Sequence, residues 1–410
     1  MKIATVCSGI GSPEQALKEL GIPHEIYFAC EIDKYAKKSY LENFTPKIML
    51  SDMTKESWIG KEYYSDLFIG GIPCQSFSLA GKRLGELDPR GLLFYDYYRY
   101  IKKQQPKYFI IENVKGLLSD NDGNTFQNWI NLLGQSVNGT PFFFPHEDSL
   151  LYNLHWEVLN TKDYELPQNR ERVFLVGIRN ELPNDFVFPG KKPLKLRLKD
   201  ILEKHVNKKY YLSKKMIDGF ISHSERHREK GNGFKFETKD TNSIANTITT
   251  TEGSRGYNNF IKEGYINQNT QASQVFSEFG ISPTLASGTH GYANGYVKIG
   301  AVRGRNPEKP KSRKSGLETE QMLEINENGV SNCLSTVQKD NLVIEYGYET
   351  LIRRLTPLEC FRLQGYPDSF FYNCESVNSD TQLYKQVGNT ISVTVIKAIL
   401  KNLLKNETTY

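Results

Sequence analysis

Short apolar runs alternate with polar, helix-forming stretches over the first 180 residues of the chain. Continuous apolar runs of this length, separated by helical stretches, predict the strands of a mostly parallel sheet that is covered on both faces. The expected fold class is therefore α/β. The strands are expected at residues 2–7, 25–30, 67–70, 108–111, 156–159 and 173–177.

Helical patterns are clearest near the two ends of the chain. A helix through Leu20 is expected after the first strand, and Pro13 suits its first turn because proline lacks the N–H that a first turn leaves unpaired. After Arg354 the chain again resembles its first part. Residues 391–404 form an amphipathic pattern that predicts a helix packed on the first domain.

The pattern changes at about Pro189. Residues 190–345 lack strand–helix alternation and are rich in Gly, Asn, Thr and Ser. Three loosely similar segments, 243–249, 281–287 and 330–336, are expected to form short strands and loops of a second, smaller domain. Their spacing is too irregular for a solenoid.

Length and charge narrow the function only slightly. A chain of 410 residues is long enough for two domains. The net charge of +5, from 52 basic and 47 acidic residues, is weak evidence for a polyanionic partner. Basic residues cluster at 191–215 and 303–314, which fits either solvated surface or nucleic-acid contact.

Cysteine and histidine spacing argues against metal sites. The six cysteines are scattered, and none of them are in C-x-x-C spacing. This pattern argues against a zinc site and against a disulfide framework. His223 and His227 lack the glutamate of an H-E-x-x-H motif and are expected on an exposed helix. Without an apolar run of about 18 residues or a signal peptide, a cytoplasmic location is expected.

The turn after the first strand is a candidate cofactor site. Gly9 and Gly11 resemble a dinucleotide fingerprint, but Glu14 stands at the third glycine position and disfavours a pyrophosphate. Glu31, 22 positions after Gly9, could accept hydrogen bonds from ribose hydroxyls, and Asp52 could accept one from an adenine amino group. This set favours S-adenosylmethionine over NAD. The alternative is that both acids only begin helices.

A second candidate site is the loop after the strand at 67–70. It starts with Gly70 and Gly71 and carries the Pro73–Cys74 pair. Open α/β sheets bind ligands at the carboxyl ends of their strands, and proline fixes the backbone ahead of the thiol. Cys74 is thus a candidate nucleophile, with a buried structural cysteine as the alternative.

Together with several further motifs, these residues resemble the cytosine-C5 DNA methyltransferase family. The resemblance implies a Rossmann-like, S-adenosylmethionine-dependent methyltransferase domain at 1–189. It also implies a target-recognition domain at 190–345 and a segment, 346–410, that returns to complete the cofactor site. The matching motifs, in the order that the family has, are 7–11, Glu31, Asp52, 73–78, 90–94, 112–114, 167–173, 354–360, 364–367 and 386–390.

The resemblance assigns catalytic roles to five residues. Cys74 adds to C6 of cytosine and converts C5 into a carbon nucleophile, while Glu112 shares a proton with N3. Arg172 holds O2 and offsets negative charge, and Arg170 and Gln168 support the loop or the DNA phosphates. A thiol cannot reach C6 within a stacked duplex, so the target base must be flipped out of the helix.

The resemblance also assigns a cofactor set and no metal. The family usually has phenylalanine against the adenine ring where Cys7 stands, so weaker cofactor binding or compensation by a neighbour such as Ile32 is expected. Ser12 likewise replaces a common glycine. The expected cofactor-binding residues are Cys7, Gly9, Ile10, Gly11, Glu31, Ile32, Asp52, Met53, Pro73, Leu93, Asn389 and Thr390.

Four functions remain open from the sequence. The first is a monomeric DNA methyltransferase that modifies duplex DNA for protection, with a cognate restriction endonuclease as a candidate partner and no membrane partner. The second is a tRNA methyltransferase, since one branch of the family acts on tRNA. The third is a DNA-binding module without catalysis, and the fourth is an NAD-dependent oxidoreductase. The long, loop-rich recognition region favours DNA.

Overall fold

The computed structural model divides into two compact units, which are described separately. The first comprises Met1–Val206, Ser213–Ile261 and Arg354–Tyr410, and the second comprises Asn207–Leu212 and Lys262–Arg353. Pro73, Cys74, His223 and His227 lie outside the described residues, as do segments 281–287 and 330–336. The described residues are 1–72, 93–213, 216, 219, 222, 238–239, 242–250, 259–263, 297–305, 320–325, 342–345, 351–405 and 407.

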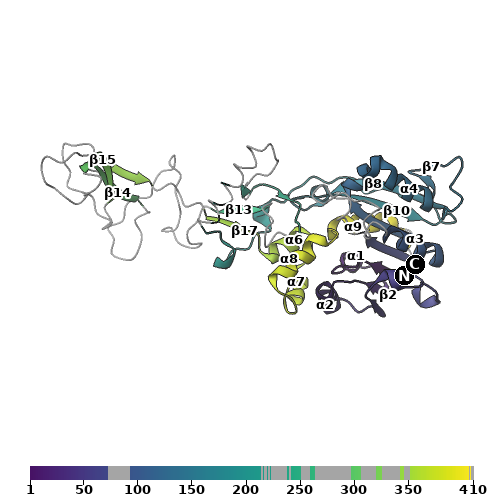
Figure 1. The fold of residues 1–410 in the computed structure, drawn as a ribbon. Coiled ribbons are helices and arrows are strands. Elements are labelled where there is room, and N and C mark those ends of the chain that lie inside the picture. The colour runs from purple at the N-terminus through teal and green to yellow at the C-terminus, as the bar shows by residue number, and fades with distance from the viewer. Residues whose placement is uncertain are drawn as a thin grey trace. The chain divides into compact units, whose positions relative to one another are not determined.

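One sheet organises the first unit, with strand order β3-β2-β1-β4-β5-β10-β8-β6-β7 (Figure 1). The predicted α/β class with a mostly parallel sheet is confirmed, because β3, β2, β1, β4 and β5 pair in parallel. The strands are β1 Lys2–Val6, β2 Glu25–Cys30, β3 Ile48–Leu50, β4 Leu67–Gly71, β5 Tyr108–Val114, β6 Gly134–Val137, β7 Thr140–Pro141, β8 Tyr152–Asn160 and β10 Glu171–Ile178.

The strand β10 runs against both of its neighbours, β5 and β8. Only the short helix η6 (Thr161–Tyr164) and the strand β9 (Gln168–Asn169) connect β8 to β10. A parallel crossover needs a dozen or more residues, so this connection permits only an antiparallel return. The two strands predicted at 156–159 and 173–177 are present, and β8 starts four residues before its predicted range (156 − 152).

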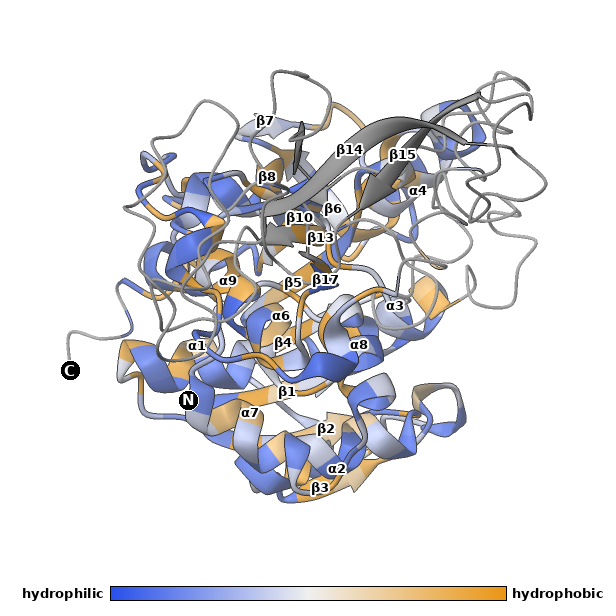
Figure 2. Cartoon of the chain, turned by 90° about the vertical axis from the view of Figure 1, so that its left-hand side faces the viewer, coloured by the Kyte–Doolittle hydropathy of each residue, from blue (hydrophilic) through white to orange (hydrophobic). Residues whose placement is uncertain are grey.

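Helices cover both faces of the sheet. Figure 2 shows α1 and α9 on one side of β1, β4 and β5, and α3 and α4 on the other. Proline stands in the first turn of α1, and α9 occupies the predicted C-terminal helix. The α-helices are α1 Ser12–Leu20, α2 Lys34–Asn43, α3 Leu93–Gln104, α4 Asn124–Leu133, α6 Pro357–Leu363, α7 Asp368–Glu375, α8 Asp380–Asn389 and α9 Val393–Leu403. Short 3-10 helices are η1 Met53–Lys55, η2 Lys61–Tyr63, η5 Lys115–Gly123, η6, η7 Leu198–Asp200 and η8 Lys208–Tyr210.

An aromatic core lies between α3 and the sheet. Apolar side chains recur on α3 at helical spacing, so one face of this helix is buried. The rings of Phe68 and Tyr100 stack with centroids 4.1 Å apart, and those of Phe94 and Trp129 stack at 4.4 Å. This packing fixes α3, which follows residues 73–92 in the sequence, against the sheet.

Polar contacts join the C-terminal segment to the first helices. Ser39 Oγ donates to Gln386 Oε1 at 2.8 Å, and Asn378 Nδ2 donates to Ser39 Oγ at 2.8 Å. Lys385 forms an ion pair with Asp33, the residue that caps α2. The segment Arg354–Tyr410 therefore belongs to the same compact unit as Met1–Val206.

Smaller strands make up the remaining described chain. In the first unit β12 (Ala245–Asn246) pairs with β9, and β11 (Thr238–Lys239) pairs with the start of β13 (Phe260–Glu263). In the second unit β14 (Val297–Arg305) pairs antiparallel with β15 (Glu320–Ile325) and β16 (Leu342–Glu345). The strand β17 spans Leu351–Arg354. Within the described chain, every helix is too short or too polar to cross a bilayer.

Candidate active site and cofactor turn

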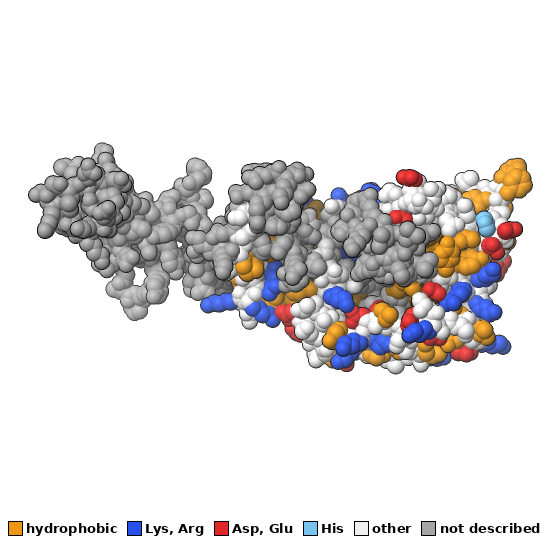
Figure 3. Space-filling view, in the orientation of Figure 1, with side chains coloured by type: hydrophobic (Ala, Val, Ile, Leu, Met, Phe, Trp, Pro, Cys, Tyr) orange, Lys and Arg blue, Asp and Glu red, His pale blue; other side chains and the backbone are white. Residues whose placement is uncertain are grey.

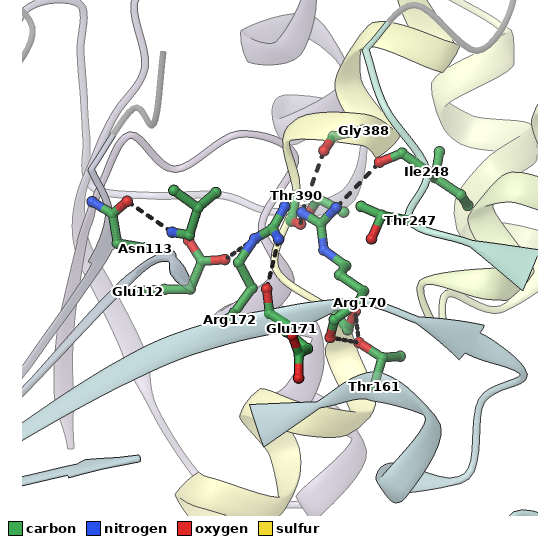
Figure 4. Close-up of polar contacts among 12 residues, drawn as sticks. Glu112, Asn113, Thr161, Arg170, Glu171, Arg172, Thr247, Ile248, Gly388 and Thr390 are labelled. Atoms are coloured by element: carbon green, nitrogen blue, oxygen red, sulfur yellow. Dashed lines mark hydrogen bonds and ion pairs between the residues drawn. The ribbon is translucent and has the colours of Figure 1, made fainter. Parts of the chain in front are cut away.

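A carboxylate and a guanidinium meet where β5 and β10 lie side by side. Glu112, near the carboxyl end of β5, opposes Gly71 on β4 and Phe174 on β10. Arg172 Nε lies 3.1 Å from Glu112 Oε1, as Figure 4 shows. Only 10% of the Glu112 side chain and 17% of the Arg172 side chain are exposed. Two residues predicted to share one site are thus in contact.

Burial and the arginines act on Glu112 in opposite directions. Removal from water disfavours the charged carboxylate, while Arg172, and more weakly Arg170, favour it. The loss of water has the larger effect, so the pKa of Glu112 is raised above its ordinary value. Glu112 can therefore hold a proton at a higher pH than an exposed glutamate can.

The start of the Pro73–Cys74 loop lies directly against this carboxylate. A Cβ atom added at Gly71 would stand 3.0 Å from Glu112 Oε2, closer than nearly all real contacts of that kind. Glycine at this position therefore lets β4 approach the carboxylate. On the neighbouring residue Asn113, Oδ1 accepts a hydrogen bond from Val114, and Nδ2 has no partner among the described residues.

Arg170 and Gln168 are buried and bind backbone groups of other segments. The Arg170 guanidinium donates to the carbonyl oxygens of Ile248, Gly388 and Thr390 at 3.2, 3.3 and 2.8 Å (Figure 4). Gln168 Nε2 donates to the Leu363 oxygen at 2.7 Å, and its Oε1 accepts from the Ile248 N–H at 3.2 Å. Both side chains thereby fix the 245–250 segment and the C-terminal segment to the catalytic unit.

The first turn wraps around the carboxylate of Glu31. The Gly9 N–H donates to Glu31 Oε2, and the Asp33 N–H donates to Oε1, both at 2.8 Å. Burial raises the pKa of Glu31, although these hydrogen bonds oppose the shift. Gly9 and Gly11 have φ values of 55° and 92°, a region that favours glycine. The turn therefore places the Gly9 backbone against Glu31, two residues that the sequence assigns to one cofactor site.

The other residues of the predicted cofactor set differ in exposure. Asp52 Oδ1 accepts from the N–H and hydroxyl of Thr54 at 3.1 and 2.7 Å, so it caps η1, and the hydroxyl bond chiefly lowers its pKa. Ile32 is 77% exposed. In contrast, Ile10 and Met53 are buried, and Leu93 is half-buried at the start of α3.

The two residues predicted from the C-terminal segment are close in sequence but differ in environment. Asn389 ends α8 and is exposed, whereas Thr390 is buried. Thr390 Oγ1 lies 2.9 Å from the Tyr366 hydroxyl, and both atoms contact the Ser12 hydroxyl. Ser12 thus has a structural use that glycine could not supply, because its hydroxyl ties the first turn to the C-terminal segment.

Sequence reasoning missed the part played by Glu14. Its side chain is fully buried, and Oε1 accepts hydrogen bonds of 2.7 Å from both the Thr5 and the Tyr40 hydroxyls. Burial raises its pKa. The sequence signal that could have revealed this role is the position of Glu14 on the apolar face of a short helix. Burial of a carboxylate there is unfavourable in free energy unless the carboxylate is hydrogen-bonded. No cluster of metal-ligating side chains is present among the described residues.

Comparison with known proteins identifies the family. Residues 1–405 match the family model described as C-5 cytosine-specific DNA methylase. The chain belongs to this family, and it is by that membership a DNA cytosine-C5 methyltransferase. The resemblance drawn from the sequence motifs is therefore confirmed.

Relatives match along nearly the whole chain. The orphan methyltransferase M.SPRI of Bacillus phage SPR is 31% identical over 456 residues, covering 98% of this chain and 97% of that protein. The type II methyltransferase M.HpaII of Haemophilus parainfluenzae is 31% identical over 403 residues, covering 97% of this chain and 87% of that protein.

Solved structures agree on the fold. The S. pombe Dnmt2 methyltransferase aligns with a TM-score of 0.59 at 16% identity, covering 100% of this chain and 99% of that chain. The Entamoeba histolytica methyltransferase EhMeth aligns with a TM-score of 0.61, also at 16% identity, and covers the same shares. These matches support the Rossmann-like fold of the methyltransferase domain.

Proposed function

We propose that this protein transfers a methyl group from S-adenosylmethionine to C5 of a flipped-out cytosine in a specific duplex DNA sequence. The observation that carries this proposal is the contact between Glu112 and Arg172, which stands beside the start of the Pro73–Cys74 loop. Family membership supplies the reaction class. The pair supplies an acid and a cation beside Gly71, three residues before the expected nucleophile in the sequence (74 − 71).

The first turn suits S-adenosylmethionine. The Glu31 carboxylate accepts the backbone N–H groups of Gly9 and Asp33, and its oxygens can also accept hydrogen bonds from the ribose hydroxyls. The exposed Ile32 side chain offers an apolar surface for adenine beside it. When bound, the cofactor supplies an electrophilic methyl group. Cys7, Gly9, Gly11, Asp52 and the other residues predicted above would complete its site.

The chain's own residues prepare cytosine to accept this methyl group. Cys74 forms a bond to C6, and the electron pair of the C5–C6 double bond becomes available at C5. Glu112 donates its proton to N3 as negative charge develops there, and its raised pKa favours that role. Arg172 offsets charge at O2. The Cys74 thiolate leaves when the C5 proton is removed after methylation.

Arg170 and Gln168 act here as supports. Their side chains already bind backbone carbonyl and N–H groups, so we propose that they hold the loops around the flipped base. The target base must leave the duplex because C6 is inaccessible within the base stack.

We propose residues 190–345 as the target-recognition domain and residues 346–410 as the segment that completes the catalytic domain begun by 1–189. Base contacts are expected around 249–257, 284–292 and 335–339. On the face seen in Figure 3, lysine and arginine side chains are mixed with acidic and apolar ones over the described surface. On this face, phosphate contact is therefore expected from dispersed basic residues.

The relatives include both an orphan phage methyltransferase and a type II methyltransferase. We therefore propose a role in DNA modification or protection, which a cognate restriction endonuclease could accompany. We expect a monomer that works in the cytoplasm beside the nucleoid, because each catalytic event needs one flipped base on chromosomal DNA.

The first experiment is to incubate the protein with S-adenosylmethionine and unmethylated genomic DNA and to map 5-methylcytosine by bisulfite sequencing. A consensus sequence around the modified cytosines is expected. Methylation of tRNA but not of DNA would instead favour a tRNA methyltransferase. Cofactor binding without any methylation would favour a DNA-binding module that lacks catalysis.

The covalent step has a separate test. A duplex that carries 5-fluorocytosine in the consensus cannot lose its C5 substituent, so it should remain bonded to Cys74. Cys74→Ser should remove this adduct and methyl transfer while leaving DNA binding intact. Loss of DNA binding in that variant would argue that Cys74 is structural.

A further inference from the structure

A buried tyrosine hydroxyl lies where the first turn and the nucleophile loop begin. Tyr97 stands on the buried face of α3, and its ring packs on Phe68 with centroids 5.5 Å apart. Its hydroxyl donates to the Val6 carbonyl oxygen, the last residue of β1, at 3.4 Å. A Cβ atom added at Gly70 of β4 would lie only 2.2 Å from this hydroxyl. One hydroxyl therefore contacts the ends of both strands.

The same hydroxyl also contacts the half-buried Cys7 side chain. Burial raises the pKa of the Cys7 thiol to about 12, so Cys7 keeps its proton near neutral pH. A neutral thiol can donate S–H to the Tyr97 oxygen while the Tyr97 O–H donates to Val6. The three groups then form a short chain of hydrogen bonds from the cofactor turn to the backbone of β1.

We propose that Tyr97 is a positioning residue that couples the cofactor turn, through Cys7 and Val6, to the loop that starts at Gly70 and carries the nucleophile. This inference rests on the proposed function. The strands β1 and β4 already pair in parallel, with Val6 opposite Gly70, and the Tyr97 hydroxyl adds a contact to both strand ends from α3, which the aromatic core fixes in place. Loss of the hydroxyl frees Cys7 to rotate and leaves a gap beside Gly70.

The consequence concerns alignment between two reacting groups. Methyl transfer needs C5 and the methyl carbon in line at close range, and small displacements reduce the rate steeply. The β1–β4 ladder sets the separation of the two strands, and the Tyr97 hydroxyl restrains Cys7 and the backbone where the chain leaves that ladder. Removing this hydroxyl should therefore affect cofactor affinity and nucleophile addition together, rather than either one alone.

The test compares two variants of the full-length protein, Tyr97→Phe and Tyr100→Phe. Tyr100 is a matched control because it is also buried on α3, and its hydroxyl is also bonded, to Ser65 Oγ at 2.9 Å and the Tyr63 oxygen at 2.7 Å. Those partners precede β4, at the opposite end of the strand from the loop. Tyr100→Phe thus removes a comparable hydroxyl away from the site.

Three quantities are measured for each variant. They are the Kd for S-adenosylmethionine, the single-turnover methylation rate, and the cofactor-independent exchange of the cytosine C5 hydrogen with water. In Tyr97→Phe we expect the Kd to rise about three- to tenfold, which corresponds to one lost hydrogen bond. Both rates should fall by a similar factor, while the Kd for DNA stays unchanged. Tyr100→Phe should match the wild type in all of these.

A second variant keeps the inference testable if Tyr97→Phe folds poorly. Cys7→Ala alone removes the same contact from the other side, so it should raise the Kd for S-adenosylmethionine and slow both rates. Where Tyr97→Phe folds, the double variant should bind S-adenosylmethionine no more weakly than the weaker-binding single variant, because the two groups act together. Additive effects would overturn the coupling through Cys7. Equal effects of Tyr97→Phe and Tyr100→Phe would overturn the inference while leaving the proposed function intact. A wild-type protein that bound no S-adenosylmethionine would overturn both.

Discussion

Arg172 Nε lies 3.1 Å from Glu112 Oε1, although the two residues do not oppose each other in the sheet. Arg172 opposes Val114, and Glu112 opposes Phe174, so the pair is diagonal on one face of β5 and β10. Diagonal neighbours lie within reach only of long side chains. The antiparallel pairing of β10 with β5 therefore brings the two groups together. Arg172 can contact Glu112 while the Glu112 carboxylate stays beside Gly71.

Replacement of Glu112 by Gln should reduce kcat by about 100-fold or more, because an amide keeps the shape but cannot transfer a proton. The pH dependence provides a second signature. Burial raises the pKa of Glu112, and the protonated form is the active one. The wild-type rate should therefore fall as pH rises through that pKa, and Glu112→Gln should lack this decline.

Glu171→Gln is the matched control for this measurement. Glu171 lies on the same strand as Arg172 but is exposed, with a surface ion pair to Lys115 at 3.1 Å. Its replacement should leave kcat and its pH profile unchanged. A pH decline that survived in Glu112→Gln would assign the titrating group elsewhere.

The two arginines of the Gln-x-Arg-x-Arg motif should respond differently to replacement by methionine. Arg170 donates three hydrogen bonds to buried backbone carbonyls, so Arg170→Met should reduce the free energy of unfolding by about 3 kcal/mol or more. Arg172→Met should leave that free energy within about 1 kcal/mol, since Glu112 can take up a proton when its cation is lost.

For catalytic activity, Arg172 is expected to be the more sensitive of the two arginines. Arg172→Met should reduce kcat by about 100-fold in a folded protein, by analogy with the loss of one transition-state donor. It should also shift the pH decline of the rate to higher pH, because the pKa of Glu112 rises without its cation. Urea unfolding and single-turnover kinetics on both variants measure the contrast. A stable, inactive Arg170→Met would contradict it.

The sequence could predict the parts of this fold that local patterning determines. Apolar runs predicted β1, β2, β4 and β5, and the motif order predicted the family. The antiparallel pairing of β10 was not predicted, because an apolar run looks the same for a parallel and for an antiparallel strand. Only the short connection between β8 and β10 determines the direction of β10.

The motif resemblance predicted that Glu112 and Arg172 share a site, and the structure places the two side chains in contact. Contacts between distant segments were not predicted. Ser12 looked like a departure from the family, yet its hydroxyl is used by Tyr366 and Thr390. The sequence alone does not single out Tyr97, because helical spacing reveals a buried face but not what the hydroxyl at its tip contacts.

Glu14 should make the stability of the protein depend on pH. Burial raises its pKa in the folded state above the ordinary value of 4.5, so the folded protein holds this proton more tightly than the unfolded chain does. Its contribution is present below about pH 4.5 and is lost as pH rises toward the folded-state pKa. Glu14→Gln keeps an acceptor for Thr5 and Tyr40 but cannot titrate.

Urea midpoints at several pH values test this. The stability of the wild type relative to Glu14→Gln should decline as pH increases above about 4.5. Glu19→Gln is the control, because Glu19 lies on the same helix but at its surface, paired with Lys397 at 2.7 Å. A difference between wild type and Glu14→Gln that did not vary with pH would show that Glu14 is ionised in the fold.

Gly11 is expected to tolerate no side chain. Its φ of 92° is unfavourable for any residue with a Cβ, and such an atom would lie 2.4 Å from Phe44 Cε2. Gly21 ends the same helix with a φ of 65°, but an added Cβ there would have nothing within 4 Å. Gly21→Ala therefore measures the free-energy cost of the backbone conformation alone. Gly21→Ala should reduce the free energy of unfolding by about 1–2 kcal/mol.

Gly11→Ala should cost about 1–3 kcal/mol more than Gly21→Ala, because Phe44 and the turn must shift to make room. The turn also holds the Gly9 N–H against Glu31, so the Kd for S-adenosylmethionine should rise in Gly11→Ala and remain unchanged in Gly21→Ala. Denaturant unfolding and cofactor titration of the two variants measure both effects. Equal losses of stability would show that Phe44 moves aside freely, and the close approach of α2 to the first turn would then not constrain the cofactor site.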